Sequence, residues 1–120
     1  AAISKALREV IARHKPTVCA IEGLFYAQNV KTALTMGEAR GAAMAALAEC
    51  DLEIFEIAPR KVKQSIVGYG NAQKIAVAKM VQRMLALKEL PAPDAADALA
   101  LALTHSHLHN RFAIDPAQKI

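Results

Sequence analysis

Three carboxylates occur where the surrounding residues are apolar. Glu22 ends the apolar run 17–21, and Asp94 and Asp97 open an otherwise apolar stretch that continues to Leu103. Carboxylates are rarely buried in a protein core unless they are paired or bind a metal. If the three side chains converge, a divalent cation is the simplest physical reason, and such a cation indicates phosphate chemistry.

Each carboxylate also has a simpler structural interpretation. Glu22 could face water at a strand end. Asp94 and Asp97 are spaced i, i+3, so on a helix they share one face, and acids at a helix start stabilise it by about 1 kcal/mol. One acid is enough for that role, however, and a second on the same face repels it. The prolines Pro91 and Pro93 would hold the pair rigidly, so we favour a metal site.

The ligand chemistry indicates which metal. Oxygen ligands without a His or Cys set are typical of Mg²⁺ or Mn²⁺ rather than Zn²⁺. Two such ions about 3.5–4 Å apart can activate a water and stabilise the leaving oxygen in phosphodiester hydrolysis.

The apolar periodicity predicts the elements that position these residues. We expect helices over 2–14, 29–49, 59–67, 72–87 and 94–107 and strands over 17–22 and 52–57. A strand, a helix and a strand in succession form a βαβ unit, whose strands are parallel with a right-handed crossover. Glu22 then lies at the carboxyl end of a strand, where ligands bind in open α/β sheets.

Length and composition indicate one folded domain. The chain has 120 residues and is 54% hydrophobic, which excludes disorder. We expect residues 1–109 to form the domain and residues 110–120 an irregular tail. Two parallel strands make a poor sheet, and residue 2 already reads as helical, so we expect further strands before residue 1.

The remaining composition bears on the compartment. Charges interrupt every apolar run before it reaches transmembrane length, and no signal peptide is visible. Cys19 and Cys50 fit neither a disulfide framework nor a zinc site. We therefore expect no membrane association and a reducing cytoplasm.

The charge is unevenly distributed. No acid occurs from Ile57 to Lys88, whereas this segment carries seven cations: Arg60, Lys61, Lys63, Lys74, Lys79, Arg83 and Lys88. A segment of one sign suits a polyanion such as DNA or RNA. A solvated cationic face explains the charge equally well.

Several other residues allow two interpretations. Phe25, in the loop after Glu22, could belong to the core or stack on a base. Gly37 and Gly41 allow close approach of another helix, either within the fold or from a second subunit.

The histidines near the C-terminus form a separate group. His105 and His109 are spaced i, i+4 and could share a metal. More often, residues such as His105, His107 and His109 simply end a helix, where positive charge suits the exposed carbonyls.

Four motifs occur in order along the chain. They are Ala20-Ile21-Glu22 followed by Phe25, Met36-Gly37-Glu38-Ala39-Arg40-Gly41, the stretch from Val62 to Ala72 with Lys74, and Asp94-Ala95-Ala96-Asp97-Ala98-Leu99-Ala100 with Thr104-His105. Together these motifs resemble the RuvC Holliday junction resolvases of bacteria, over about residues 3–107.

The resemblance implies an α/β, RNase H-like three-layer fold, here without its N-terminal strands. It implies a homodimeric, Mg²⁺-dependent endonuclease of recombination and repair, with two Mg²⁺ ions per site, for which Mn²⁺ can substitute. Such enzymes nick two opposed strands of a four-way DNA junction and work with the branch-migration proteins RuvA and RuvB in the bacterial cytoplasm. The helix with Gly37 and Gly41 resembles the one that pairs across the dimer two-fold.

The resemblance also implies roles for single residues. Glu22, Asp94 and Asp97 match three of the four acidic groups that bind the metals and catalyse cleavage. Phe25 matches the phenylalanine that acts near the junction crossover. Lys63 and Lys74 match basic residues that handle DNA.

One part of the family pattern is missing from the printed sequence. The family begins with a strand that carries an Asp, and no such strand is present here, so we expect the chain by itself to be inactive. A non-catalytic junction-binding module and another RNase H-like metal nuclease are the alternatives.

Overall fold

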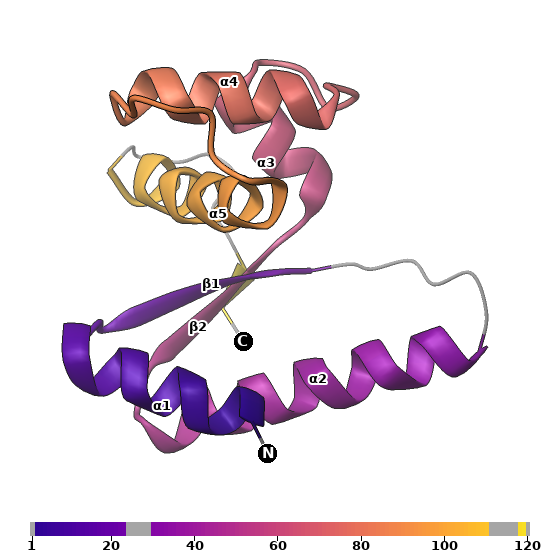
Figure 1. Cartoon of the computed structure of the whole chain (residues 1–120), viewed down its shortest axis with the longest axis vertical. Coiled ribbons are helices and arrows are strands. Elements are labelled where there is room, and N and C mark those ends of the chain that lie inside the picture. The colour runs from indigo at the N-terminus through magenta and orange to yellow at the C-terminus, as the bar shows by residue number, and fades with distance from the viewer. Residues whose placement is uncertain (1, 24–29, 111–117, 120) are drawn as a thin grey trace. The chain divides into compact units, whose positions relative to one another are not determined.

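The computed structural model describes residues 2–23, 30–110 and 118–119. The helices are α1 (Ala2–His14), α2 (Val30–Glu49), α3 (Pro59–Ile66), α4 (Lys74–Met84) and α5 (Pro93–Asn110), and the strands are β1 (Val18–Glu22), β2 (Glu53–Ile57) and β3 (Gln118–Lys119) (Figure 1). The chain divides into two compact units. The first holds α1 and α2, and the second holds the end of β1 with α3, α4 and α5.

The strands form one sheet in the order β1-β2-β3. The Glu53 N–H donates to the Thr17 carbonyl at 3.3 Å, and the Gly23 N–H donates to the Ile57 carbonyl at 2.9 Å. Both partners advance along the chain in the same direction, so β1 and β2 are parallel. The predicted βαβ unit is thereby confirmed.

The C-terminal part differs from our expectation of an irregular tail over 110–120. Helix α5 continues to Asn110, and Gln118–Lys119 form the short strand β3 beside β2. A two-residue strand has no periodicity of its own, so only its pairing with β2 defines it.

Helix α1 packs against α2 in the first unit. The α1 sequence is amphipathic, and Arg8 on its polar face forms an ion pair with Glu49 of α2. Both side chains of this pair are about half exposed, so the pair adds little to stability. Cys19 and Cys50 form no disulfide, and burial raises the pKa of Cys19.

Helices α3, α4 and α5 pack on one another in the second unit (Figure 1). Their apolar faces and the end of β2 form its core, made of Ile57, Val62, Ile66, Ala72, Val77, Val81 and Ala100. Ala96, Ala100 and Thr104 recur every four residues on α5 and are all buried. The Thr104 hydroxyl donates to the Ala100 carbonyl at 2.8 Å, which satisfies the one buried hydroxyl of this stripe.

None of the helices in the described residues is long and apolar enough to cross a membrane.

Helix α4 ends three residues before the predicted end at residue 87. Ala86 adopts a left-handed backbone with φ of 52°. Its N–H donates to the Arg83 carbonyl at 3.2 Å, while the Leu87 N–H donates to the Gln82 carbonyl at 2.9 Å. These two bonds form a Schellman cap, which usually has glycine at the left-handed position. An alanine there gives no sequence signal for a helix end.

We predict that Ala86→Gly raises the free energy of unfolding by about 0.5–1 kcal/mol, because glycine adopts the left-handed region without steric cost. Denaturant unfolding followed by circular dichroism measures the change. The matched control is Ala76→Gly inside α4, which we expect to lower the same free energy by about 1 kcal/mol. Equal destabilisation by both substitutions would contradict the prediction.

Candidate active site

The three candidate carboxylates lie at element ends, and their residues are exposed. Glu22 is the last residue of β1, and Asp94 and Asp97 are the second and fifth residues of α5. Two apolar neighbours of the aspartates, Ala96 and Ala100, occupy the buried face of the helix, whereas Ala95 and Ala98 are exposed like the aspartates. The apolar surroundings of the three carboxylates in the sequence suggested that they lie in the core. The structure shows instead that they lie at its surface.

A pocket in the second unit brings several predicted site residues together. Its polar lining consists of two carboxylates, Glu22 and Asp97, and two ammonium groups, Lys63 and Lys74. Its apolar walls are Pro59, Val62, Val77, Ala100 and Leu101. Strand β1 supplies Glu22, while α3, α4 and α5 supply Lys63, Lys74 and Asp97 in turn. Four segments far apart in the sequence thus contribute to one site.

Lys74 connects α4 with α5. Its Nζ lies 3.8 Å from Oδ2 of Asp97, and the two side chains are 79% and 52% exposed. An ion pair as exposed as this contributes little to stability, because water screens it. Its significance is positional, since it places a cation directly beside a candidate metal ligand.

Helix stability does not explain the position of Lys74. It is the first residue of α4, whose first turn contains no acid, and Gln73 before it makes no side-chain capping hydrogen bond. A cation at this positive helix end costs about 0.3–1 kcal/mol. Lys74 therefore lowers the stability of the helix that it begins. Residues that break a local stability rule in this way are often found at functional sites.

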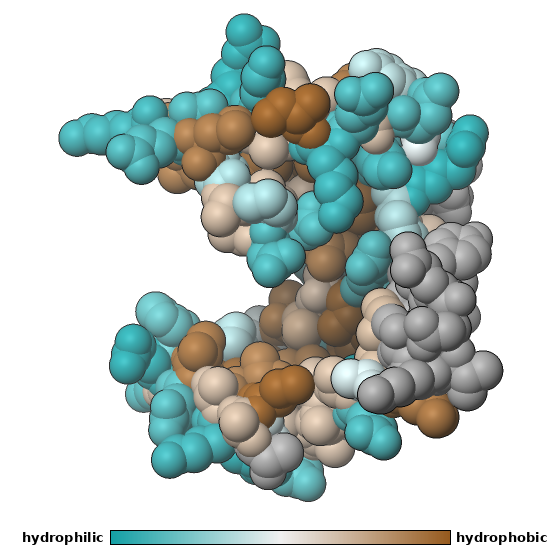
Figure 2. All heavy atoms as spheres, turned by 45° about the vertical axis from the view of Figure 1, so that its right-hand side comes forward, coloured by the Kyte–Doolittle hydropathy of each residue, from teal (hydrophilic) through white to brown (hydrophobic). Residues whose placement is uncertain are grey.

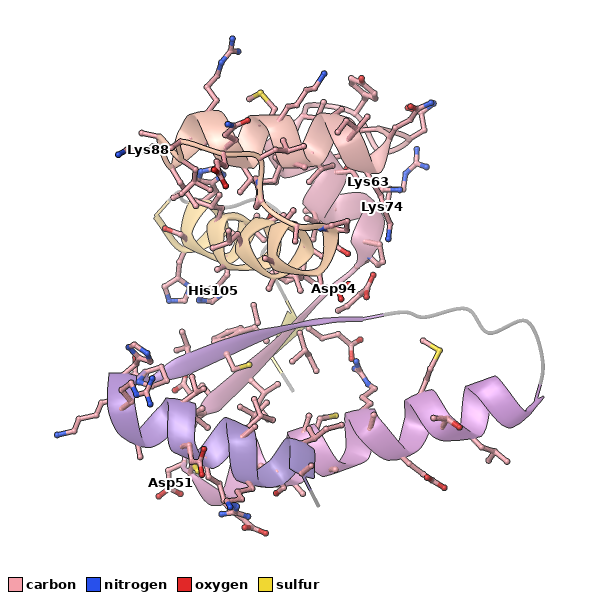
Figure 3. The ribbon with its side chains drawn as sticks, in the orientation of Figure 1. Asp51, Lys63, Lys74, Lys88, Asp94 and His105 are labelled. Carbon is pink, nitrogen blue, oxygen red and sulfur yellow. The ribbon has the colours of Figure 1, made fainter. Side chains whose placement is uncertain are left out.

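Asp94 is not among the pocket-lining residues. Figure 3 shows it at the same end of the three-helix unit as Lys63 and Lys74. Helix α5 begins at Pro93, so neither aspartate is the capping residue. Asp94 lies in the first turn, where the helix dipole favours an acid, whereas Asp97 lies beyond it. Stabilisation of the helix start, the simpler role considered for both aspartates, therefore explains Asp94 better than Asp97.

The donor set of the pocket fits a hard divalent cation. Mg²⁺ binds through one or two carboxylates, keeps several waters and takes further oxygens from substrate phosphates. Glu22 and Asp97 meet that requirement, and no thiol or imidazole lines the pocket. Within the described ranges, no three His, Cys, Asp or Glu side chains lie together as a metal-binding group. The pocket thus offers two carboxylates rather than the expected set of three.

The other predicted residues are only partly described. Phe25 lies outside the described residues. A Cβ atom added at Gly37 or Gly41 would meet no atom within 4 Å, so nothing in the described chain uses the close approach that these glycines allow.

Sequence reasoning did not identify the apolar walls of the pocket. Val62 and Val77 belong to the core periodicity of α3 and α4, so the pattern that predicts those helices conceals their second role. It also missed a contact outside this pocket, where Ser65 Oγ lies 3.3 Å from His107 Nδ1. The sequence signal that could have identified a wall residue was its position beside a candidate site residue, as Val62 directly precedes Lys63.

The cationic segment is well exposed. Five of its seven cations are exposed, namely Arg60, Lys74, Lys79, Arg83 and Lys88. Figure 2 shows hydrophilic side chains over much of the unit formed by α3, α4 and α5, with apolar ones between them. Such a surface is compatible with a polyanion and with simple solvation, so charge alone does not decide the function.

Comparisons with known proteins agree on one family. The family model described as crossover junction endodeoxyribonuclease RuvC matches residues 1–105. The RuvC protein of Pasteurella multocida is 50% identical over 105 residues, which are 88% of this chain and 55% of that protein. The RuvC protein of Koribacter versatilis is 51% identical over 108 residues, which are 89% of this chain and 65% of that protein.

A solved structure agrees with the sequence matches. The structure of Thermus thermophilus RuvC in complex with a Holliday junction substrate superposes with a TM-score of 0.87 and 36% identity, covering 98% of this chain and 70% of that one. The curated relatives are longer, and the chain spans between 55% and 65% of their length.

Proposed function

Because the chain belongs to the crossover junction endodeoxyribonuclease RuvC family, we propose that the full-length protein cleaves four-way DNA junctions. The fold is the RNase H-like α/β fold of that family, as predicted from the motifs. Junction DNA is the substrate because the family name specifies it and because the surface around the pocket is cationic.

The mixed charge of the pocket carries the proposal. Phosphodiester hydrolysis needs carboxylates to hold a cation and cations to hold the phosphate, and the pocket provides Glu22 and Asp97 for the first and Lys63 and Lys74 for the second. Asp94, one helical turn before Asp97, completes the set of ligands that we propose for Mg²⁺ or Mn²⁺. Bound as a pair, these ions would activate a water and stabilise the leaving oxygen.

The start of α4 suits a phosphate of the substrate. The Ala76 N–H donates to the Gln73 carbonyl at 3.0 Å, but the first two N–H groups of the helix, those of Lys74 and Ile75, have no acceptor within the helix and receive no side-chain cap from Gln73. Lys74 at this end adds a full positive charge, and helix N-termini of this kind bind phosphates. The feature that destabilises α4 thus becomes favourable when a DNA backbone is bound.

Homodimerisation through α2 fits the same proposal. Leu34, Gly37 and Gly41 lie on one exposed face of α2 and continue to Ala45 and Ala48. Apart from Leu34 these residues are glycine or alanine, and such small residues allow the backbones of two helices to approach closely. Two sites related by a two-fold axis would suit paired cuts in a junction.

We propose RuvA and RuvB as partners and the bacterial cytoplasm as the compartment on the family relationship alone.

The activity is proposed for the full-length protein. The family pattern has a fourth carboxylate on a strand that the printed sequence does not contain, so we propose that the 120-residue chain by itself does not cleave DNA. Residues 1–109 are the proposed portion of the nuclease domain. Phe25 is proposed to act at the junction crossover.

The decisive experiment compares a four-way junction with a linear duplex of the same sequence. We expect the full-length protein to bind the junction preferentially and to cut it in Mg²⁺ as a symmetric pair of nicks. Junction binding without cleavage would favour a non-catalytic binding module. Equal cutting of the linear duplex would favour another RNase H-like nuclease.

A further inference from the structure

The end of α5 carries a histidine pair that the proposed nuclease does not use. The ring centroids of His105 and His109 lie 4.8 Å apart, and the two ring planes are tilted by 34° relative to each other. The two residues are spaced i, i+4, which places their side chains on the same face of the helix. We propose that this pair forms a second metal site, which binds a borderline transition-metal ion such as Zn²⁺ through one nitrogen of each ring.

The geometry supports chelation by both rings. Two histidines four residues apart on one helix face are the arrangement that binds zinc in helical metal motifs. Side chains at this spacing have Cβ atoms about 5–6 Å apart. Rotation of both side chains can therefore bring one nitrogen of each ring to the zinc–nitrogen distance of about 2.0–2.1 Å from a shared ion. Solvent would complete the coordination, because no third His, Cys, Asp or Glu in the described residues joins the pair.

The protonation state also suits a metal. Burial of the ring and the positive charge of His109 both lower the pKa of His105, with burial the larger cause. Imidazole must be neutral to coordinate a metal. The same effect argues against the simpler role of a charged helix end, because two adjacent imidazolium groups would repel each other.

This site is separate from the carboxylate pocket in both position and chemistry. His105 follows Asp97 by eight positions on α5, a rise of about 12 Å along the helix. Figure 3 shows His105 far along α5 from Asp94. Imidazole nitrogens select Zn²⁺, Cu²⁺ or Ni²⁺, whereas carboxylate oxygens select Mg²⁺ or Mn²⁺. The two sites can therefore be titrated independently.

His107 offers a matched control on the same helix. It lies between the two proposed ligands in the sequence, but its Nδ1 is 3.3 Å from the Ser65 hydroxyl. A residue two positions from each ligand points to a different side of the helix. Its replacement changes the histidine count by one, as the replacement of His105 or His109 does.

The test is calorimetric titration of the protein with Zn²⁺ in excess Mg²⁺, which occupies the carboxylates. We expect His105→Gln and His109→Gln to weaken one Zn²⁺ site on the order of a hundredfold, since a chelate becomes a single ligand. His107→Gln should leave that site unchanged. Equal loss in all three variants, or an affinity unchanged in His109→Gln, would overturn the proposal. Circular dichroism of each variant shows whether α5 remains folded.

A second measurement identifies the ligands directly. Substoichiometric Cu²⁺ broadens the NMR signals of imidazoles that bind it, and the protein has four histidines to compare. We expect the signals of His105 and His109 to disappear together and before those of His107 and His14. Broadening of His14 first, or of all four histidines in parallel, would show surface binding only and overturn the site.

Discussion

Asp97→Asn in the full-length protein is expected to reduce junction cleavage in Mg²⁺ by on the order of a thousandfold or more, while junction binding is retained. The substitution keeps the shape of the side chain but removes the charge that we propose holds the cation. Metal ions stabilise the transition state of phosphoryl chemistry by several kcal/mol, and each 1.36 kcal/mol is a factor of about ten in rate. Asp97 is exposed, so the core should be unaffected.

Single-turnover cleavage of a labelled four-way junction measures the rate, and a gel-shift assay in Ca²⁺ measures binding. Asp51→Asn is the matched control, because Asp51 is also exposed and does not line the pocket. Its backbone has a φ of 61°, which asparagine adopts readily. Cleavage by Asp97→Asn at the rate of Asp51→Asn would contradict the metal role of Asp97.

Asp94→Asn separates catalysis from helix stability at the other aspartate. If Asp94 serves only the helix dipole, its replacement changes the free energy of unfolding by about 0.3–1 kcal/mol and leaves the cleavage rate intact. We expect the rate to fall as it does for Asp97→Asn, because the proposed ligand set includes both residues.

The sequence predicted the helix starts and the βαβ unit well, because their causes are local. Pro59 begins α3 as predicted, at the position where a proline is best tolerated. Helix α5 begins at Pro93, one residue before the predicted start at Asp94. The end of α4 was predicted too late because Ala86 adopts a conformation that sequence patterns assign to glycine. Strand β3 was missed because two residues carry no alternation, and its pairing with β2 depends on the tertiary fold.

In the candidate site, too, features with local causes could be predicted from the sequence, whereas features that depend on tertiary packing could not. Glu22 at a strand end and the cationic segment could be read from the sequence, since they depend on single elements. The pairing of Lys74 with Asp97 could not, because it depends on how α4 packs against α5. The exposure of Asp94 and Asp97 was also hidden, since two of the alanines that made them conspicuous, Ala96 and Ala100, lie on the buried face of α5.

Lys74→Gln is the second substitution with a large expected effect. It should reduce junction cleavage and DNA binding but not reduce the stability of the protein or its affinity for Mg²⁺. Without the ammonium group, we expect junction cleavage to fall on the order of a hundredfold, as for other single electrostatic contacts to a reacting group. Junction binding should weaken, and the slope of log affinity against log salt should decrease in magnitude by about one, because one phosphate contact is lost.

The same substitution should stabilise helix α4 and strengthen the binding of Mg²⁺. Removing a cation from the positive end of α4 relieves a cost of about 0.3–1 kcal/mol, so the free energy of unfolding should rise or stay unchanged. Binding of Mg²⁺ should strengthen, because Lys74 no longer competes for Asp97 at 3.8 Å. A residue whose loss improves stability and metal affinity but impairs cleavage acts on the DNA and not on the fold.

Lys88→Gln is the control that isolates this role. Lys88 belongs to the same acid-free segment and is exposed, but it does not line the pocket, and Figure 3 shows it at the opposite end of the unit from Lys74. If the segment binds DNA only as a diffuse cationic surface, the two substitutions should weaken binding equally and leave Mg²⁺ affinity alone. A loss of cleavage confined to Lys74→Gln, together with stronger Mg²⁺ binding, would instead establish that the pocket couples a metal ligand to a phosphate-binding cation.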